Sequence, residues 1–367
     1  MKRNRVHNFS AGPAQLPLEV LEEVRDELTN YKNIGSSIIE ISHRDKTFVD
    51  LAPESETQLR KLLHLDDSYE VIFMQGGATL QFSLIPINFI KKKGKGSYAE
   101  VGSWSSKAIK EASKVCDVDI CFTAKANNFT EIDELDKWKI HDDSQLIHYC
   151  KNETIQGINI KQDPDFDLPV FVDMSSCLFS ENINFSKYDF IYACAQKNFG
   201  ASGLTLIIAK KELLSKANPD LPNILNINSH SEANSMLNTP NTFSWYLAGK
   251  MFKWYLEQGG IIEMEKRALT KSKILYSLID ESSFYLNPVN KAQRSDNNVV
   301  FTIHDNSLEE KFLKEAEASG LMYLKGHRSV GGMRASIYNS MEKSSVEELA
   351  NFMKDFEQKN GLSLIHI

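Results

Sequence analysis

The sequence predicts an α/β protein in which a large domain, with a mostly parallel sheet flanked by helices, precedes a smaller α+β C-terminal domain. Short apolar runs of strand length alternate with helical patterns from Tyr69 onward, which is typical of a parallel sheet covered on both faces. A chain of 367 residues is long enough for two domains. After Asn287-Pro288, shorter strand and helix patterns indicate the second of them.

The first elements are helical. Residues 1–16 form an extended lead-in marked by glycine and proline. Pro17 then opens a helix over 18–29, because proline is favoured at helix starts and apolar side chains recur on one face. A second helix is expected over 48–65.

The alternating region follows. Its strands are short apolar runs bounded by turn residues, and its helices lie between them. Strands are expected at 70–74, 96–101, 118–122, 146–150, 170–172, 190–193 and 204–209, with helices at 80–89 and 103–115.

The C-terminal part begins after an irregular polar stretch, 218–242. We expect helices over 243–259, 261–281, 307–319 and 345–359, with strands over 299–303 and 333–338, and Ser345 as the N-cap of the last helix. The predicted division is a lead-in over 1–16, a large cofactor-binding domain over 17–260 and a small domain over 261–361. The final residues, 362–367, read LSLIHI, and we interpret them as a non-native tail outside the fold.

Composition narrows the classes of function. The chain is 42% hydrophobic and 25% charged, as in ordinary globular proteins, and its net charge of -7 argues against a nucleic-acid partner. No apolar run is long enough to span a bilayer, so no membrane partner is expected. The five cysteines show no CxxC pattern and the nine histidines no metal-ligand spacing. We therefore expect a cytoplasmic protein with neither disulfides nor a bound metal.

Lys197 stands out because it lies between two apolar runs, Phe190–Ala195 and Leu204–Ala209. Burial penalises the charge of a lysine and lowers its pKa. The neutral amine can then attack a carbonyl and form a Schiff base. An ordinary surface lysine on a hairpin turn is the alternative interpretation.

Further polar residues follow other strands, at the sheet edge where ligands collect. Asp173 could pair with the protonated pyridine nitrogen of pyridoxal phosphate, or cap the next element. The turn 75–79 could cradle a phosphate at a helix start. Trp104 could cover one face of a flat ring and Thr154 could bind a ring hydroxyl, although a core tryptophan and a turn threonine are common.

Two His-Arg pairs, His43-Arg44 and His327-Arg328, are followed by Arg334. The arginine fork binds carboxylates and phosphates through two hydrogen bonds. Several arginines converging on one pocket would indicate a substrate with more than one anionic group. Separate surface ion pairs are the alternative for each arginine.

Seven segments carry a resemblance to the phosphoserine aminotransferase family that extends over residues 7–361. They are Asn8–Ala14, Ser42–Arg44, Gln75–Ala78, Asn152–Thr154, Gln196–Asn198, Asn238–Pro240 and Gly326–Ser336. The resemblance implies pyridoxal-phosphate fold type I and a homodimer with active sites at the subunit interface. It implies transamination between L-glutamate and 3-phosphohydroxypyruvate, a phosphorylated 2-oxo acid, giving O-phospho-L-serine and 2-oxoglutarate in serine biosynthesis. Use of 4-phosphohydroxythreonine, in pyridoxine biosynthesis, stays open.

The resemblance also implies residue roles. Lys197 would be the Schiff-base lysine and Asp173 the partner of the pyridine nitrogen, with Trp104 stacked on the ring and Thr154 bound to its oxygen. The cofactor phosphate would be surrounded by Gly77, Ala78, Thr79 and Gln196, joined from the other subunit by Asn238 and Thr239. Substrate carboxylates would meet Arg44 and Arg334, and the substrate phosphate would meet His43, His327 and Arg328, the last two across the interface.

One departure from the family pattern concerns Thr79, because some bacterial members have an arginine there. Binding of the substrate phosphate would then depend more on the His-Arg pairs. Two other functions remain as alternatives. A lyase or cysteine desulfurase on the same fold would need a mobile, exposed cysteine, whereas Cys177 and Cys194 lie in or near apolar strand segments. A non-enzymatic ligand-binding domain is the other alternative.

Overall fold

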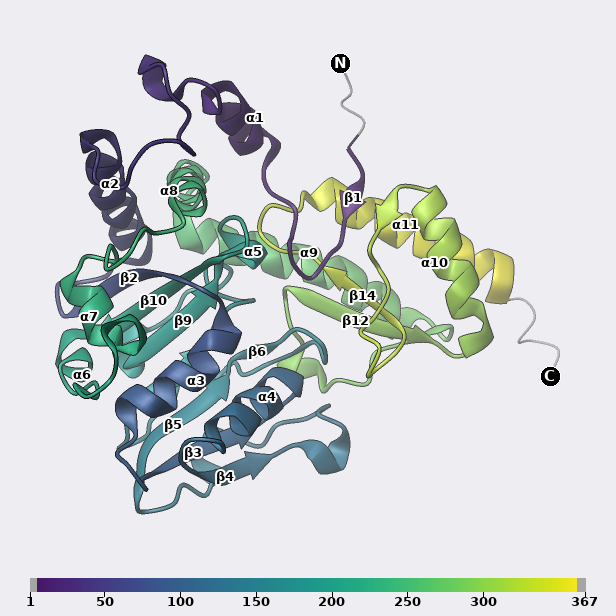
Figure 1. The fold of residues 1–367 in the computed structure, drawn as a ribbon. Coiled ribbons are helices and arrows are strands. Elements are labelled where there is room, and N and C mark those ends of the chain that lie inside the picture. The colour runs from purple at the N-terminus through teal and green to yellow at the C-terminus, as the bar shows by residue number, and fades with distance from the viewer. Residues whose placement is uncertain (1–4, 362–367) are drawn as a thin grey trace.

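The structure is a computed structural model that describes residues 5–361. The proposed non-native tail, 362–367, and the first four residues of the lead-in lie outside the described residues. A large central sheet and a smaller sheet beside it organise the chain (Figure 1).

The central sheet has seven strands in the order β2-β10-β9-β8-β5-β3-β4. Its strands are β2 (Tyr69–Gln75), β3 (Lys95–Glu100), β4 (Asp117–Thr123), β5 (Ser144–Cys150), β8 (Val170–Asp173), β9 (Phe190–Cys194) and β10 (Leu204–Lys210). Neighbours pair in parallel except β10, which runs antiparallel to both β2 and β9. The link over 195–203 is too short for a parallel crossover, so β10 must return antiparallel. The predicted mostly parallel sheet is confirmed.

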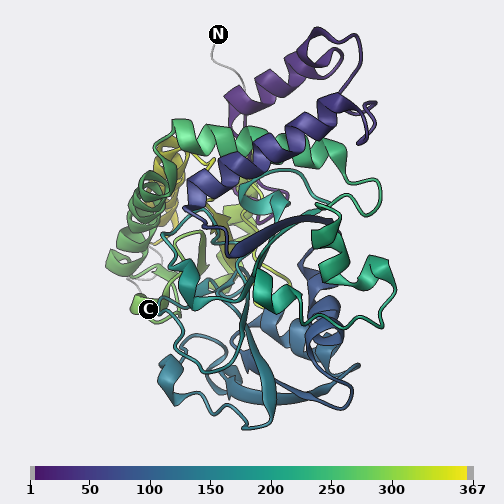
Figure 2. The same ribbon diagram turned by 90° about the vertical axis from the view of Figure 1, so that its left-hand side faces the viewer.

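Helices cover both faces of this sheet (Figure 2). Successive strand residues point to opposite faces, so Val71 and Phe73 enter one apolar core while Ile72 and Met74 enter another. The first core is shared with α2 (Lys46–Leu63) and α8 (Thr242–Glu257), and the second with α3 (Ala78–Phe89) and α4 (Ser103–Ala112). Helix α1 (Leu18–Glu27) and the N-terminal end of α2 project from the body.

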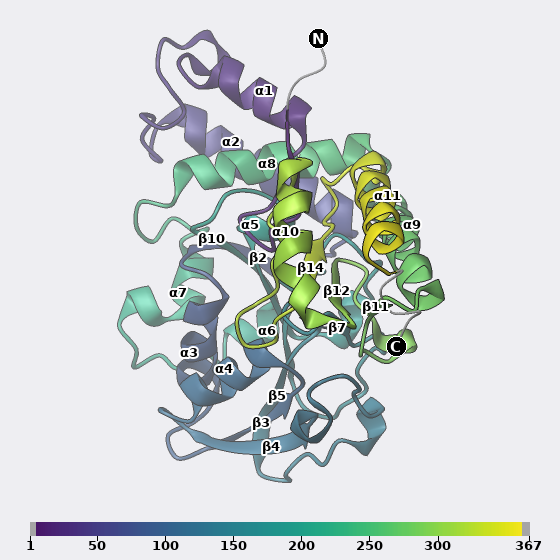
Figure 3. The ribbon, with the colours of Figure 1, turned by 90° about the vertical axis from the view of Figure 1, so that its right-hand side faces the viewer.

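The C-terminal part holds a three-stranded antiparallel sheet, in the order β11-β12-β14. The helices and strands of this C-terminal part are α9 (Gly260–Glu281), β11 (Tyr285–Leu286), β12 (Asn298–Ile303), α10 (Glu309–Ala318), β13 (Leu321–Met322), β14 (Met333–Ser336) and α11 (Lys343–Asn360). The three helices lie together beside this sheet (Figure 3). Their apolar core also contains Phe9. Domain boundaries at 17, 261 and 361 stay a prediction.

The lead-in is tied to this C-terminal part. Strand β1 (His7–Asn8) pairs in parallel with β13. The N–H of Ser336 donates to the carbonyl of Phe9 at 3.1 Å. The N-terminal segment thus joins β13 to β14 of the C-terminal part, a connection that local sequence patterns did not reveal.

Several expected local details were wrong. Helix α11 begins at Lys343 with Glu342 in the N-cap position, so Ser345 lies within the first turn, where its hydroxyl bonds His7 Nδ1 at 2.8 Å. The helix expected over 307–319 splits into a 3-10 turn and α10. The irregular stretch 218–242 contains the short helix α7 (Ile227–Glu232). Among residues 5–361, no helix is both long and apolar enough to cross a bilayer.

Candidate active site

Lys197 lies in α5 (Ala195–Asn198), a single helical turn between β9 and β10. Its Nζ donates to Thr154 Oγ1 at 3.1 Å and lies 5.6 Å from the centroid of the Trp104 ring. Trp104 belongs to the first turn of α4, and Thr154 follows the short strand β6 (Asn152–Glu153). Three of the residues predicted from the sequence therefore meet at the end of the central sheet.

The expected pKa of Lys197 was wrong. Burial does lower it, but the electrostatic influence of Tyr338, Asp173, Cys194 and Cys150 outweighs burial and leaves the pKa above the ordinary value. Reasoning from the sequence counted burial and could not count neighbours supplied by distant segments. In this structure the amine is a cation that Asp173 balances.

Asp173 ends β8, where it pairs with Cys150 on one side and Tyr192 on the other. Its side chain is buried, and Oδ1 accepts the N–H of Ser175 at 2.8 Å. Burial raises the pKa of this carboxyl, opposed by Lys197 and by the bonds to Ser175. A buried carboxyl of this kind gains from a further cationic partner.

The turn before α3 has the form expected of an anion cradle. Gly76 has φ +108°, and a Cβ there would lie 2.6 Å from Leu80 Cδ2, so only glycine fits. Helix α3 then begins at Ala78 and runs for 12 residues, and the N–H groups of its first turn favour an anion. Thr79 is exposed in that turn.

Two neighbours join this turn to the rest of the site. The N–H of Ala78 donates to Cys194 Sγ at 3.0 Å, and Gln75 Nε2 donates to the carbonyl of Thr239 at 2.6 Å. Within the described residues, Gln196 Oε1 and Trp104 Nε1 are buried without a hydrogen-bond partner. Such orphaned atoms gain free energy when a ligand pairs with them.

A cationic wall stands beside Trp104, and we define it as Lys107, His327, Arg328 and Arg334. Lys107 Nζ lies 3.9 Å from the centroid of the Trp104 ring. Burial lowers the pKa of His327, and Arg334, Lys107 and Arg328 lower it further. Arg334 Nε is buried and unpaired among residues 5–361. Sequence reasoning missed Lys107, although it lies three residues after Trp104 and therefore on the same side of the predicted helix.

Other predicted residues do not meet Lys197 within this chain. Arg44 is exposed and its N–H donates to Ser42 Oγ at 3.2 Å, while His43 is half-buried. Both lie just before α2, in the projecting part of the fold. Asn238 and Thr239 are exposed, and the carbonyl of Thr239 contacts the cradle through Gln75.

Comparison with known proteins decides the family. The model of the aminotransferase class-V family matches residues 6–349. A phosphoserine aminotransferase from Vesicomyosocius okutanii subsp. Calyptogena okutanii is 46% identical over 358 residues, which is 98% of this chain and 100% of that protein. The chain belongs to the phosphoserine aminotransferase family.

Solved structures of this family agree. The phosphoserine aminotransferase of Bacillus circulans subsp. alkalophilus has a TM-score of 0.95 and 39% identity, covering 97% of this chain and 99% of that one. A phosphoserine aminotransferase of Trichomonas vaginalis, solved with bound pyridoxal phosphate, has a TM-score of 0.91 and 38% identity, covering 95% of this chain and 100% of that one. The expected fold type I architecture is confirmed.

The alternative functions are less well supported. A desulfurase needs an exposed cysteine, whereas Cys177 and Cys194 are buried at 0% and 5% exposure. Burial raises the pKa of both thiols, which keeps them in the unreactive neutral form. Family membership likewise favours an aminotransferase over a non-enzymatic binding domain.

Sequence reasoning also missed Glu153. Its carboxylate accepts the N–H of Trp104 at 2.9 Å and, through the other oxygen, both the N–H and the hydroxyl of Ser105 at 2.8 Å. Burial raises its pKa, opposed mainly by the bonds to Ser105 and Trp104. A buried acid at the start of α4 thus holds the tryptophan beside Lys197. Its position next to Thr154 was the only signal in the sequence.

Replacing Glu153 with Gln is expected to lower the free energy of unfolding by about 1–3 kcal/mol, because the amide nitrogen cannot accept an N–H. Chemical denaturation of the cofactor-free protein measures this change. The exposed Glu232 offers a matched control, and Glu232→Gln should stay within about 0.5 kcal/mol of wild type. Equal stability of the two variants would contradict a capping role for Glu153.

Proposed function

We propose that this chain is a pyridoxal-phosphate-dependent phosphoserine aminotransferase. It transfers the amino group of L-glutamate to 3-phosphohydroxypyruvate, reversibly, giving O-phospho-L-serine and 2-oxoglutarate. The single observation that carries the proposal is the meeting of Lys197, Thr154, Trp104 and Asp173 beside the cationic wall. The names and lengths of the curated relatives support the same activity.

The residues of the site fit pyridoxal phosphate. The raised pKa of Asp173 and the orphaned Gln196 Oε1 and Trp104 Nε1 mark a site that lacks partners of complementary charge and polarity. Lys197 would hold the cofactor through its amine, Asp173 its ring nitrogen, Thr154 its ring oxygen and Trp104 its face. Its phosphate would be held by Gly77, Ala78, Thr79 and Gln196. When bound, this cofactor supplies an electron sink for the charge left by the departing α-proton.

The chain's own residues then perform the remaining work. Lys197 Nζ accepts the α-proton of the substrate and later returns it, as a general base and acid. The hydroxyl of Thr154 fixes the direction of this amine. Asp173 supplies a buried negative charge at the site. Trp104 covers one side of the site and excludes water from it. Arg334 anchors the substrate carboxylate, which fixes the orientation of the breaking bond.

The substrate phosphate would be bound by His327 and Arg328, with Lys107 adding positive charge. His327 and Arg328 lie beside Lys107 of the same chain, so we assign them to this chain's own site and not to a site across the interface. His43 and Arg44 complete the set in a homodimer, in which Asn238 and Thr239 serve the site of the other subunit. The projecting segment before α2 exposes apolar Ile34 and Ile39 at 48% and 58%, and the start of α2 exposes Val49 at 46%. These side chains support a surface that a second copy covers.

We further propose a cytoplasmic location, supported by the free cysteines among the described residues. We also propose that the enzyme accepts 4-phosphohydroxythreonine, since the cationic wall can bind both the phosphate and the carboxylate of a substrate. A large domain over 17–260 and a small one over 261–361 remain our proposed division.

Steady-state assays test the function, with glutamate and 3-phosphohydroxypyruvate as one substrate pair and with 4-phosphohydroxythreonine and 2-oxoglutarate as the other. We expect turnover with 3-phosphohydroxypyruvate, at a rate that saturates as the concentration of the amino donor glutamate rises. Release of sulfide from cysteine, without glutamate-dependent turnover, would overturn the proposal in favour of a desulfurase. Sedimentation of the holoenzyme tests the homodimer.

Arg334→Lys is expected to lower kcat/KM for glutamate about 100-fold, because a lysine loses the two-pronged bond to a carboxylate. The loss should appear in both KM and kcat, since the same contact binds the substrate and orients the breaking bond. Arg328→Lys provides a contrast, because Arg328 faces the phosphate in our proposal. It should weaken 3-phosphohydroxypyruvate and leave glutamate within about threefold. Equal losses for both substrates in both variants would contradict the assignment.

A further inference from the structure

Lys271 is a buried lysine outside the residues assigned so far. It lies on α9 and is 2% exposed. Its Nζ donates to the carbonyl of Tyr338 at 2.6 Å and to that of Met341 at 2.9 Å. The amine thus pins both ends of one backbone turn, 338–341.

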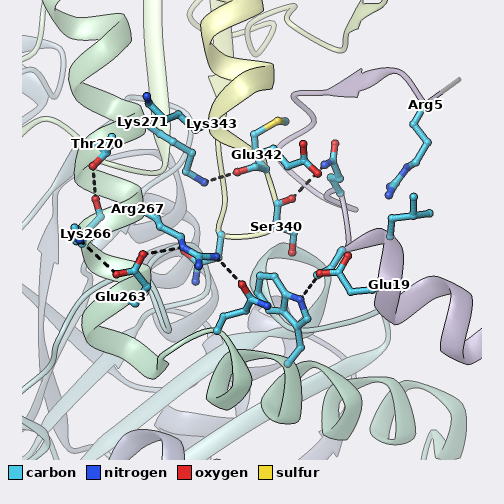
Figure 4. A pocket seen from close by; sticks show the side chains of 17 residues that line it. Arg5, Glu19, Glu263, Lys266, Arg267, Thr270, Lys271, Ser340, Glu342 and Lys343 are labelled. Carbon is cyan, nitrogen blue, oxygen red and sulfur yellow. Dashed lines mark hydrogen bonds and ion pairs between the residues drawn. The ribbon is translucent and has the colours of Figure 1, made fainter. Parts of the chain in front are cut away.

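Residues 339–341 of this turn form part of the wall of a pocket of about 480 Å³. Figure 4 shows Lys271 on its helix, across from the segment that carries Ser340 and Glu342. The neighbouring cations are already paired, because Arg267 and Lys266 both contact Glu263 and Lys343 contacts Glu347. We therefore look for the role of Lys271 in the turn that it holds and not in a ligand of the pocket.

One end of the turn reaches Lys197 through Tyr338. The hydroxyl of Tyr338 donates to the carbonyl of Ala11 at 2.9 Å and accepts from Asn298 Nδ2 at 3.2 Å. Tyr338 also heads the neighbours whose electrostatic influence raises the pKa of Lys197. Ala11 precedes Gly12, where a Cβ would lie 3.5 Å from Lys197 Cγ, so Tyr338 anchors the backbone segment that packs against Lys197.

The next residue of the turn, Asn339, contacts the residue that follows Lys197. The N–H of Asn339 donates to Oδ1 of Asn198, the residue that follows Lys197 in the chain, at 3.2 Å. Asn339 Nδ2 donates to the carbonyl of Phe179 at 2.7 Å, and the hydroxyl of Tyr255 donates to the carbonyl of Asn198 at 2.6 Å. These buried contacts are satisfied in one arrangement of the turn, so a shift of the turn must shift Asn198.

We propose that Lys271 is a positioning residue for the transamination reaction. By holding the turn 338–341, it fixes the contacts of Tyr338 with Ala11 and of Asn339 with Asn198, and so the position and direction of the Lys197 amine. The inference rests on the proposed function. It adds a role for Lys271, whose side chain on α9 touches neither substrate nor cofactor.

The test compares the holoenzymes of wild type, Lys271→Met, Tyr338→Phe and the double variant. Methionine keeps the length and apolar stem of lysine but removes both donated bonds. The matched control is Lys273→Met, the same change at an exposed position of the same helix. The readouts are kcat, KM, the melting temperature and the pH midpoint at which the absorbance of bound pyridoxal phosphate changes.

We expect Lys271→Met to lower kcat about tenfold with KM nearly unchanged, because misplacement far from the chemistry slows the reaction itself. The absorbance midpoint should also shift, because Lys197 moves relative to the charge of Asp173 when the turn is released. Tyr338→Phe should move the midpoint in the same direction, and the double variant should move it no further. Lys273→Met should match wild type.

A lower melting temperature with a wild-type midpoint and kcat in Lys271→Met would show a structural role only and overturn the proposal. If Lys271→Met does not fold, Tyr338→Phe decides, because a wild-type midpoint in that variant removes the route from the turn to Lys197. The midpoint needs only bound cofactor. Absence of turnover by wild type would therefore overturn the proposed function and leave the role of Lys271 testable.

Discussion

Replacing Lys197 with alanine is expected to lower kcat for transamination between glutamate and 3-phosphohydroxypyruvate by more than about 10⁴-fold. Alanine removes both the amine that holds the cofactor and the base that moves the α-proton. The fold should persist, because the amine makes one hydrogen bond, to Thr154. Steady-state kinetics and the absorbance of bound pyridoxal phosphate measure the two losses.

Lys211→Ala is the matched control, since Lys211 follows β10 and its side chain is 49% exposed. Its kcat should equal that of wild type. Turnover at the normal rate in Lys197→Ala would exclude Lys197 as the catalytic base. Added methylamine should partly restore activity to Lys197→Ala and leave the control unchanged, since a free amine can replace the missing base.

Asp173→Asn is expected to lower kcat about 10²- to 10³-fold, because a neutral amide cannot keep the cofactor ring protonated. The stability of the cofactor-free protein should change in the opposite sense. Burial raises the pKa of this carboxyl in the folded state, so its ionised form costs stability above the unfolded pKa and the neutral amide removes that cost. The cofactor-free variant should therefore unfold at a temperature no lower than wild type.

Calorimetry of the cofactor-free wild type and the cofactor-free variant checks this prediction. The exposed Asp167 provides a matched control site. Asp167→Asn should alter neither kcat nor the melting temperature. A variant Asp173→Asn that is both fully active and less stable than wild type would indicate that the aspartate is a structural cap, the alternative interpretation of its position.

The sequence predicts most of this fold because its strands and helices have clear periodicity. The prediction did not specify the reversed direction of β10, although the short link after β9 requires it. It also misplaced the first residue of α11, where two polar residues compete as caps. Lys197, Thr154 and Trp104 meet as predicted because each follows a different strand of one sheet, so their residue types and positions were informative.

The rest of the site depends on contacts between distant segments. The pKa of Lys197 depends on its burial and on Tyr338 and Asp173, which belong to other segments, and the cationic wall needs His327 and Arg334 to meet Lys107. Glu153 is buried under Trp104 by the packing of β6 against α4. No local pattern in a single sequence specifies such contacts.

The lead-in has a consequence for how the chain is made. His7 pairs with Leu321, and the N–H of Ala14 donates to the carbonyl of Gln196 at 2.8 Å. Residues that leave the ribosome first thus wait for partners that are synthesised near the end. Contacts of such long sequence separation form slowly, and large chains fold part by part during synthesis. The surroundings of Lys197 therefore assemble only when the whole chain is complete, so a truncated product can contain an intact central sheet and still lack a working site.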